Sequence, residues 1–261
     1  MRIIVPIKQI LDPDSITVRR DKERVFVNRE EYIIGPGSKA ALEAALRIKD
    51  TDQSGIEVVA LSMGPRHADD ALREALAMGC DRAYLLTDKA FEEADLTVAV
   101  RVLAAAIDKL DGADLIVTGR ASGDTGAGQI GPRLAEALGY AGVTNAYALV
   151  LRSGSVQATR RWNSAYAEVE VETPAVVTVA PEAFPLRYPH GARIINAYRE
   201  WDVSVWNAVD LELGEAALEP LVASRGESFP PPLEVGERFR GDPASVAQEV
   251  IMALRLQRLV G

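Results

Sequence analysis

Short apolar runs alternate with longer segments of helical periodicity over the first half of the chain. Runs of strand type stand at residues 3–7, 56–61, 83–86 and 115–118. Segments whose apolar residues recur every three or four positions stand at about residues 38–49, 68–78, 96–110 and 129–138. Strands separated by helices of about ten residues or more indicate βαβ units. The pattern therefore predicts a mainly parallel sheet with helices on both faces.

Two local patterns interrupt this alternation near the N-terminus. Residues 16–18 and 25–27 alternate in polarity and flank the polar segment 20–23, as the strands of a hairpin do. The sequence Gly35-Pro36-Gly37-Ser38 then precedes a helical run, and Ser38 is the residue type that favours a helix N-cap. We therefore expect a β-hairpin followed by a helix that Ser38 caps.

Strand patterns follow one another directly after residue 143. They stand at residues 146–151, 155–161, 167–171 and 175–179. Without helices between them, such strands are expected to be partly antiparallel. The fold class predicted is thus α/β, a doubly wound and mainly parallel sheet with a β-rich appendage.

The C-terminal part no longer shows the alternation of strands and helices. Residues 228–232, Ser-Phe-Pro-Pro-Pro, cannot form regular structure, and Asp242-Pro243 then opens an amphipathic helix that reaches about residue 260. We predict an α/β nucleotide-binding domain at residues 1–225 and, at residues 226–261, a Pro-rich strap with a C-terminal helix. This arm would embrace a partner, and docking on its own core is the alternative.

Charge and composition exclude several classes of function. The formal net charge is −9, which disfavours nucleic-acid binding and attachment to anionic membranes. No apolar run reaches the length of a membrane helix, and the first residues lead straight into a strand, so we expect no membrane insertion, no signal peptide and a cytoplasmic location. One cysteine and two histidines give no zinc pattern, and Cys80 is expected to be a small buried hydrophobe.

A glycine-rich loop at residues 119–132 is the segment most suited to binding a ligand. It follows a buried parallel strand and opens a helix, which is where ligands bind in open α/β sheets. Its glycines let the backbone approach a ligand, and a helix N-terminus suits a phosphate. Asp124, Thr125 and Gln129 could bond a ribose or a base, and Arg120 could balance phosphate charge. A flexible βα turn without a ligand is the alternative.

Other loops are expected at the same edge of the sheet. Residues 6–8 and 63–65 follow two further strands, and residues 35–38 open a helix that can reach the same place. The loop is not the Gly-x-x-x-x-Gly-Lys-Ser/Thr sequence of kinases, and no Gly-x-Ser-x-Gly elbow or acid–base pair stands out. These features predict a nucleotide-binding protein without catalytic residues of its own.

Several segments, in order, resemble the β subunit of the electron transfer flavoproteins. Residues 35–49 resemble that family's Asn-Pro helix, which ends in Glu-x-Ala-Leu-Arg-Leu-Lys, and residues 75–83 its Ala-Leu-Ala-Met-Gly-Ala-Asp segment. Residues 119–132 resemble its Gly-Arg-Gln-x-x-Asp-x-x-x-x-Gln-x-Gly-Pro loop. Residues 174–179 and 187–189 resemble its Pro-Ala-Val-Val-Thr strand and the Arg-Tyr after it. The resemblance spans nearly the whole chain.

The resemblance implies a sheet of the adenine-nucleotide α-hydrolase-like kind and a heterodimer with an α subunit that holds FAD. This subunit would bind AMP, or a second FAD as in electron-bifurcating members, and would serve dehydrogenases or a quinone oxidoreductase as an electron carrier without enzyme activity. Loops and resemblance together predict these cofactor-binding residues: Pro6, Lys8, Gly35, Pro36, Gly37, Ser38, Met63, Gly64, Arg120, Gly123, Asp124, Thr125, Gly126, Ala127, Gly128, Gln129, Ile130 and Gly131. The resemblance implies partner docking by Ala183, Phe184, Arg187 and Tyr188.

Two other functions share such a sheet. A stand-alone adenine-nucleotide regulator of the universal-stress-protein type would need neither the Pro-rich strap nor the terminal helix. An adenylating enzyme would carry a Ser-Gly-Gly-x-Asp-Ser loop after its first strand, where this chain has Pro6-Ile7-Lys8-Gln9.

Overall fold

The computed structural model describes residues 1–51, 55–223, 228–231 and 236–260, which fall into two compact units. The larger unit comprises residues 1–19 and 24–224, and the smaller one residues 20–23 and 225–261.

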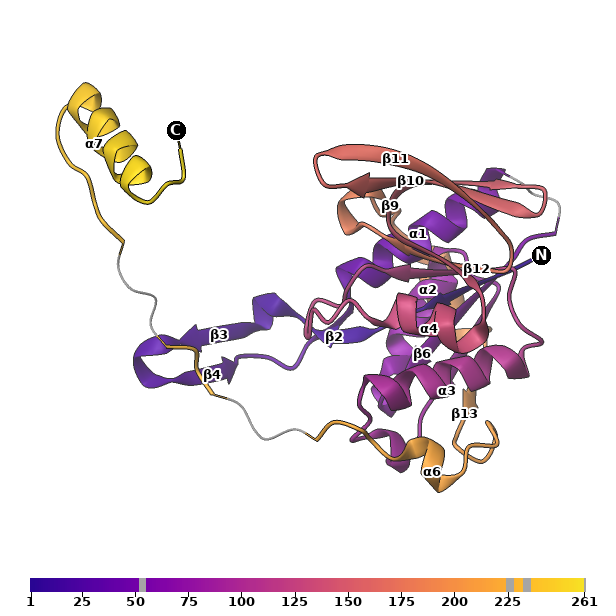
Figure 1. Cartoon of the computed structure of the whole chain (residues 1–261). Coiled ribbons are helices and arrows are strands. Elements are labelled where there is room, and N and C mark those ends of the chain that lie inside the picture. The colour runs from indigo at the N-terminus through magenta and orange to yellow at the C-terminus, as the bar shows by residue number, and fades with distance from the viewer. Residues whose placement is uncertain (52–54, 224–227, 232–235, 261) are drawn as a thin grey trace. The chain divides into compact units, whose positions relative to one another are not determined.

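A nine-stranded sheet forms the centre of the larger unit (Figure 1). In spatial order it contains β11 (Ala165–Glu172), β10 (Ser155–Trp162), β9 (Ala141–Arg152), β12 (Ala175–Val179), β8 (Leu115–Gly119), β1 (Arg2–Pro6), β6 (Glu57–Met63), β7 (Arg82–Leu86) and β13 (Val203–Trp206). The strands from β9 to β13 in this order are parallel, and β10 is antiparallel to both of its neighbours. The predicted α/β class is confirmed, and the β-rich appendage is an antiparallel extension of the same sheet.

Helices cover both faces of the sheet. One face carries α1 (Pro36–Thr51), α2 (Asp69–Met78) and α5 (Gly191–Arg199), and the other carries α3 (Leu96–Lys109) and α4 (Ile130–Leu138). Successive strand residues enter opposite cores: Ile3 and Val5 pack with α1, whereas Ile4 packs with α3. Because both of their faces are buried, the central parallel strands β12, β8, β1, β6 and β7 are continuous apolar runs without alternation.

Two arginines join α2 and α5 reciprocally. Arg193 of α5 donates to the carbonyl oxygens of Leu76 (3.0 Å) and Ala77 (2.8 Å) at the end of α2. Arg73 of α2 donates to the carbonyl oxygens of Ala197 and, at 3.1 Å, Trp201 at the end of α5. Each guanidinium thus binds carbonyl groups at or just beyond the C-terminal end of the other helix.

Smaller elements complete the unit. These are the two-stranded sheets β2 (Gln9–Leu11) with β5 (Tyr32–Ile34) and β3 (Ile16–Arg19) with β4 (Arg24–Val27), α6 (Glu215–Leu218), and the 3-10 turns η1 (Pro13–Ser15), η3 (Arg66–Ala68), η4 (Lys89–Phe91) and η5 (Pro181–Ala183). The 3-10 turn η2 (Arg20–Lys22) belongs to the smaller unit. The predicted hairpin is confirmed as β3–β4. Among the described residues, no helix combines the length and apolar character needed to cross a bilayer.

One predicted detail of α1 is wrong. The helix begins at Pro36, so Ser38 lies inside its first turn and is not the N-cap. Proline is favoured at the first helical position because its φ is already helical and no N–H is needed there. The Ser38 hydroxyl instead accepts a hydrogen bond from the backbone N–H of Lys8 at 3.0 Å.

The predicted C-terminal helix is α7 (Pro243–Leu256), in the smaller unit. Asp242 caps it as expected, accepting hydrogen bonds from the N–H groups of Ala244 and Ser245 at 3.1 Å each. None of its residues is buried, and Ile251, Met252 and Leu256 are exposed. Part of the predicted strap, residues 226–227 and 232–235, lies outside the described residues. The division at residue 225 stays a prediction.

Candidate functional site

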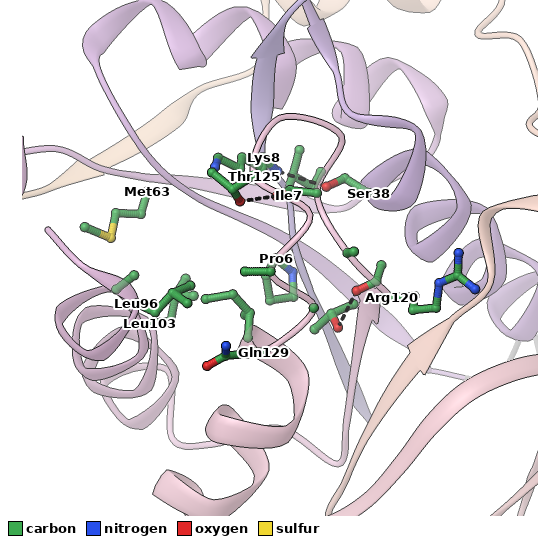
Figure 2. Close-up of a pocket in the computed structure, with 18 of the residues that line it drawn as sticks. Pro6, Ile7, Lys8, Ser38, Met63, Leu96, Leu103, Arg120, Thr125 and Gln129 are labelled. Atoms are coloured by element: carbon green, nitrogen blue, oxygen red, sulfur yellow. Dashed lines mark hydrogen bonds between the residues drawn. The ribbon is translucent and has the colours of Figure 1, made fainter. Parts of the chain in front are cut away.

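A cavity lies where the strand order of the sheet reverses. From β1 the chain proceeds to β6 and β7 on one side and then returns to β8 on the other side of β1. In a doubly wound sheet the crevice at such a switch point, beside the carboxyl ends of the strands, is the usual ligand site. The cavity found there has a volume of about 380 Å³, and Pro6 and Gly119, the last residues of β1 and β8, belong to its wall (Figure 2).

Part of the predicted cofactor site lines this cavity and part does not. The predicted residues in the wall are Pro6, Lys8, Ser38, Met63, Arg120, Thr125, Ala127, Gly128, Gln129 and Ile130. The predicted residues outside the wall are Gly35, Pro36, Gly37, Gly64, Gly123, Asp124, Gly126 and Gly131. The loops after β1, β6 and β8 and the start of α1 therefore meet at one place, as expected. Ligand contact by any of these residues stays a prediction.

The cavity has an apolar side that the sequence did not predict. The first turns of α3 supply Leu96, Ala99 and Leu103 to the wall. Leu96 and Leu103 lie on the same side of the cavity as Met63 (Figure 2). The other residues that the prediction missed are Ile7, Ala94, Asp95, Thr118, Gly119, Ala121 and Ser122. An apolar wall opposite polar side chains suits a ligand with a flat apolar ring system and a charged end.

Asp95 connects this wall to a distant part of the chain. One carboxylate oxygen caps α3, accepting from the N–H groups of Thr97 and Val98 at 2.9 Å each. The other accepts from Leu221 at 2.9 Å and Val222 at 3.1 Å. These backbone hydrogen bonds, that from Val98 first, hold the pKa of the Asp95 carboxyl below its usual value.

An ion pair joins the β1 loop to the glycine-rich loop. Lys8 Nζ lies 2.6 Å from Asp124 Oδ2, and both side chains are partly exposed. Burial alone would raise the pKa of Asp124, but hydrogen bonds from Lys8, Ser122 and Thr125 outweigh it and lower that pKa. The Ser122 and Thr125 hydroxyl oxygens lie 2.9 Å apart and fold the loop on itself. The loop is therefore ordered by its own polar contacts.

The N-terminus of α4 offers backbone donors at the cavity. Gln129 occupies the N-cap position but makes no side-chain cap; its Oε1 accepts from Arg133 Nε at 2.9 Å instead. Gly126 and Gly128 have φ of 62° and 63°, the left-handed region that glycine adopts without strain. An uncapped helix start behind such a loop presents N–H groups suited to an anion.

Two glycines of the 119–132 loop serve close packing. A Cβ on Gly119 would lie 2.5 Å from the carbonyl carbon of Gly37, so β8 and α1 touch through backbone. A Cβ on Gly131 would lie 2.2 Å from Thr178 Cγ2, so α4 packs directly on β12. The glycine signal in the sequence therefore reported helix–strand packing at these positions.

Arg120 does not aim its charge at the cavity centre. Its guanidinium points away from the other labelled side chains in Figure 2, while its backbone N–H donates to Val179 O at 2.9 Å. Together with Arg161 it lowers the pKa of Glu182, mainly set by a 2.7 Å hydrogen bond from the Tyr147 hydroxyl. The expectation that Arg120 balances a bound phosphate is not supported by this orientation.

Comparison with known proteins identifies the family. The electron transfer flavoprotein domain model matches residues 24–217. The chain belongs to the electron transfer flavoprotein family. It is 36% identical, over 100% of both chains, to the electron transfer flavoprotein subunit beta of Thermoanaerobacterium thermosaccharolyticum. It is 39% identical to that of Clostridium acetobutylicum over 84% of this chain and 83% of the relative. It is also 35% identical, over 100% of both chains, to the caffeyl-CoA reductase-Etf complex subunit CarD of Acetobacterium woodii.

These relatives establish the role as that of an electron transfer flavoprotein β subunit, and they do not favour the stand-alone regulator. The family resemblance read from the sequence is thus confirmed.

In this β subunit the four predicted docking residues are placed very differently. Phe184 is 7% exposed and belongs to the core on the α1 side, and Ala183 is half-buried. Arg187 is bound by carboxylates of α1. Tyr188 is 94% exposed and projects from the surface. Docking by this segment stays a prediction, and Tyr188 is the member free to contact a partner.

The flavoprotein subunit shows no metal centre within the described residues, where His, Cys, Asp and Glu form no suitable group of three. Cys80 is buried as predicted, and burial raises the pKa of its thiol to about 12.

Proposed function

We propose that the cavity at the ends of β1 and β8 binds an adenine nucleotide, either AMP or the AMP half of FAD. The observation that carries this is the pairing of an apolar wall on α3 with the uncapped N-terminus of α4 across one cavity. The adenine ring would lie against Leu96, Leu103 and Met63. The phosphate would accept hydrogen bonds from backbone N–H groups at the start of α4.

The cavity volume is consistent with this assignment. About 380 Å³ is near the lower end of the range for small-molecule pockets, about 300–1,000 Å³. A mononucleotide suits that size, whereas the flavin half of FAD would extend beyond the cavity. When bound, FAD supplies the redox chemistry; this chain would supply binding and orientation.

Analysis of the bound nucleotide tests this proposal. The purified protein is denatured, and the released small molecules are separated and their absorbance spectra recorded. An adenine spectrum alone indicates AMP, and an additional visible band indicates FAD. Release of neither from protein saturated with both ligands would refute the proposal.

A substitution that places a charge in the cavity wall gives a second test of nucleotide binding, with a control substitution outside the cavity. Ala127 lines the cavity and is exposed, so Ala127→Glu puts a carboxylate near the proposed phosphate without disturbing the core. Like charges placed together cost several kcal/mol, so the nucleotide Kd should rise at least about tenfold. Ala192→Glu, on exposed α5, is the control and should leave the Kd unchanged.

We further propose a heterodimer with an FAD-bearing α subunit, and an arm at residues 226–261 that binds it. Support comes from α7, whose apolar side chains Ile251, Met252 and Leu256 are exposed. Deleting residues 229–261 should abolish stoichiometric copurification with α, whereas deleting residues 257–261, which leaves α7 intact, should not. Copurification of the longer deletion at full stoichiometry would refute the arm.

The heterodimer would act as an electron carrier rather than an enzyme, accepting electrons from dehydrogenases and delivering them to an acceptor such as a quinone oxidoreductase. The name of the Acetobacterium woodii relative places that protein in a complex with a caffeyl-CoA reductase, which supports partners that act on CoA esters. In this proposal residues 183–188 form the segment that docks on the dehydrogenase, and Tyr188 is its exposed contact.

A further inference from the structure

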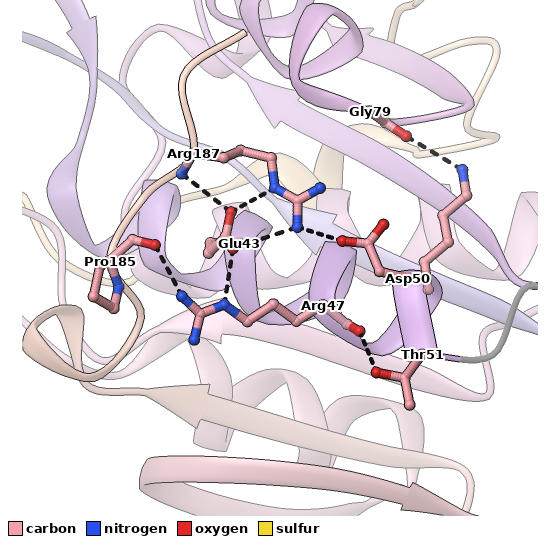
Figure 3. A network of polar contacts seen from close by, with 8 residues as sticks. Glu43, Arg47, Asp50, Thr51, Gly79, Pro185 and Arg187 are labelled. Atoms are coloured by element: carbon pink, nitrogen blue, oxygen red, sulfur yellow. Dashed lines mark hydrogen bonds and ion pairs between the residues drawn. The ribbon is translucent and has the colours of Figure 1, made fainter.

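A buried carboxylate holds the proposed docking segment against α1. Glu43 lies in the middle of α1 and is only 4% exposed. Its two oxygens accept from Arg47 Nε at 2.8 Å and from Arg187 Nε at 2.7 Å (Figure 3). The carboxylate thus lies between one arginine of its own helix and one arginine of the segment.

The backbone of the segment is bound as well. The N–H of Arg187 donates to Glu43 Oε2 at 3.2 Å, and Arg47 Nη2 donates to the carbonyl oxygen of Pro185 at 3.1 Å. A second carboxylate on α1, Asp50, accepts from Arg187 Nη2 at 2.7 Å. Residues 185–187 are therefore fixed through the Arg187 side chain, through one backbone N–H group and through one backbone carbonyl group (Figure 3).

This network adds little to the stability of the fold, but it fixes the conformation of residues 185–187. Removing two charges from water costs free energy that their attraction barely recovers, and apolar residues of the same size often do as well. Burial works to raise the pKa of Glu43, yet the hydrogen bonds from Arg187 and Arg47 outweigh it and keep the pKa below its usual value. The carboxylate therefore stays charged at neutral pH, and Tyr188 follows directly after its anchored partner.

We propose that Glu43 is a positioning residue for partner docking: it clamps residues 185–187 on α1 so that Tyr188 meets the dehydrogenase in one fixed conformation. The inference rests on the docking role given to residues 183–188 under the proposed function. Without the clamp the segment has to be ordered at the moment of binding, and that cost weakens the encounter without changing electron transfer within the bound complex.

Proteolysis of the β subunit shows first whether the clamp has opened. Trypsin needs a free arginine side chain, and the Arg187 guanidinium is engaged by Glu43 and Asp50. Glu43→Gln should therefore speed cleavage of the bond between Arg187 and Tyr188 at least about tenfold. Asp50→Asn is the matched control because Asp50 is exposed and binds the same guanidinium from the surface, so it should change the rate much less.

Kinetics with the assembled heterodimer then test function. The rate at which an acyl-CoA dehydrogenase of the same organism reduces the heterodimer is measured against heterodimer concentration. Glu43→Gln should raise KM about tenfold and leave kcat unchanged. Arg187→Gln should do the same and serves if Glu43→Gln does not fold, whereas Arg187→Lys, which keeps the charge, should lie closer to the wild-type protein.

Tyr188→Ala separates failure of this inference from failure of the docking role. If Tyr188→Ala raises KM and Glu43→Gln frees the segment without raising it, docking stands and the positioning role of Glu43 is overturned. If Tyr188→Ala leaves KM unchanged, the docking assignment itself fails and the inference with it. A fall in kcat at constant KM in Glu43→Gln would also overturn the inference.

Discussion

The packing of α4 on β12 gives the sharpest prediction, Gly131→Ala. An alanine Cβ at this position would lie 2.2 Å from Thr178 Cγ2 and 3.1 Å from Thr118 Oγ1. Carbon atoms in ordinary contact are about 3.5–4.0 Å apart, so more than an ångström of relief is needed. Thr178 is 3% exposed, and its hydroxyl accepts the N–H of Asn145 at 2.8 Å. Rotating the methyl group away would therefore break that hydrogen bond.

The magnitude follows from these contacts. Overpacking a core costs about 1–3 kcal/mol, and an unpaired buried donor about 1–3 kcal/mol. We expect a loss of about 3 kcal/mol in the free energy of unfolding, because either α4 moves or Asn145 loses its acceptor. For a chain of this size that lowers Tm by about 6–12 °C. The nucleotide Kd should rise as well, because Gln129 and Ile130 of the same helix start line the cavity.

Urea unfolding of the full chain measures the loss in the free energy of unfolding. A second substitution, Thr178→Ser, tests whether the contact with Thr178 causes that loss. Thr178→Ser removes the clashing methyl group and keeps the hydroxyl, so alone it costs about 1 kcal/mol. The double variant should also cost about 1 kcal/mol, giving a coupling energy of about 3 kcal/mol in favour of the pair. Gly191→Ala has no atom within 4 Å of its Cβ and should change stability by less than about 0.5 kcal/mol.

Two results would refute the reasoning. Gly131→Ala as stable as the wild-type chain would mean that α4 does not approach β12 this closely. A destabilised Gly131→Ala that Thr178→Ser fails to rescue would place the strain elsewhere, for example in the helix start itself.

Three further predictions concern single charged or reactive groups. Asp95→Ala should cost about 1 kcal/mol at pH 7. Because the folded-state pKa of Asp95 is lowered, its contribution is present above its unfolded pKa of about 3.9 and is lost as pH falls through the folded value. Urea titrations should therefore show the stabilities of the two proteins converging as pH falls below about 3.9. Cys80, with its pKa raised to about 12, should resist iodoacetamide at neutral pH in the native protein and react in urea; equal rates in both would contradict its burial. Lys8→Ala should lower the free energy of unfolding by less than about 1 kcal/mol, because the Lys8–Asp124 pair is partly exposed. A loss of several kcal/mol would contradict the assignment of this pair as a weak surface ion pair.

The strands of the sheet could be predicted because the signal of a buried parallel strand lies in its own residues. A parallel strand covered on both faces has to be apolar throughout, and segments such as residues 115–118 carry that signal without ambiguity. Elements stabilised from a distance were missed. Helix α5 buries Ala197 alone and leaves Ile194, Ile195 and Tyr198 exposed, so its periodicity is weak. Carbonyl groups at its C-terminal end accept from Arg73, and its own Arg193 donates to the end of α2; both contacts join residues more than a hundred positions apart.

The position of the candidate site could be predicted from the sequence, but which residues face the cavity could not. Topology alone brings the loops after β1, β6 and β8 to one edge, so Pro6, Met63 and Thr125 were expected together. Periodicity identified the apolar face of α3 but not that its first turns, at Leu96 and Ala99, face the cavity. A glycine likewise signals that something approaches closely without saying what, so the sequence could not show that Thr178 is the close neighbour of Gly131.

The charges around the cavity bear on which nucleotide it suits. Its charged lining residues are Lys8, Asp95 and Arg120, and Arg120 turns its guanidinium away. Lys8 is already paired with Asp124, and Asp95 is committed to backbone N–H groups. Binding of the first phosphate therefore depends on neutral backbone donors at α4, which are limited in number. A second and third phosphate would find no unpaired cation directed at the cavity among these residues and would meet the Asp95 carboxylate. The cavity that we propose for an adenine nucleotide thus suits a monophosphate better than a triphosphate.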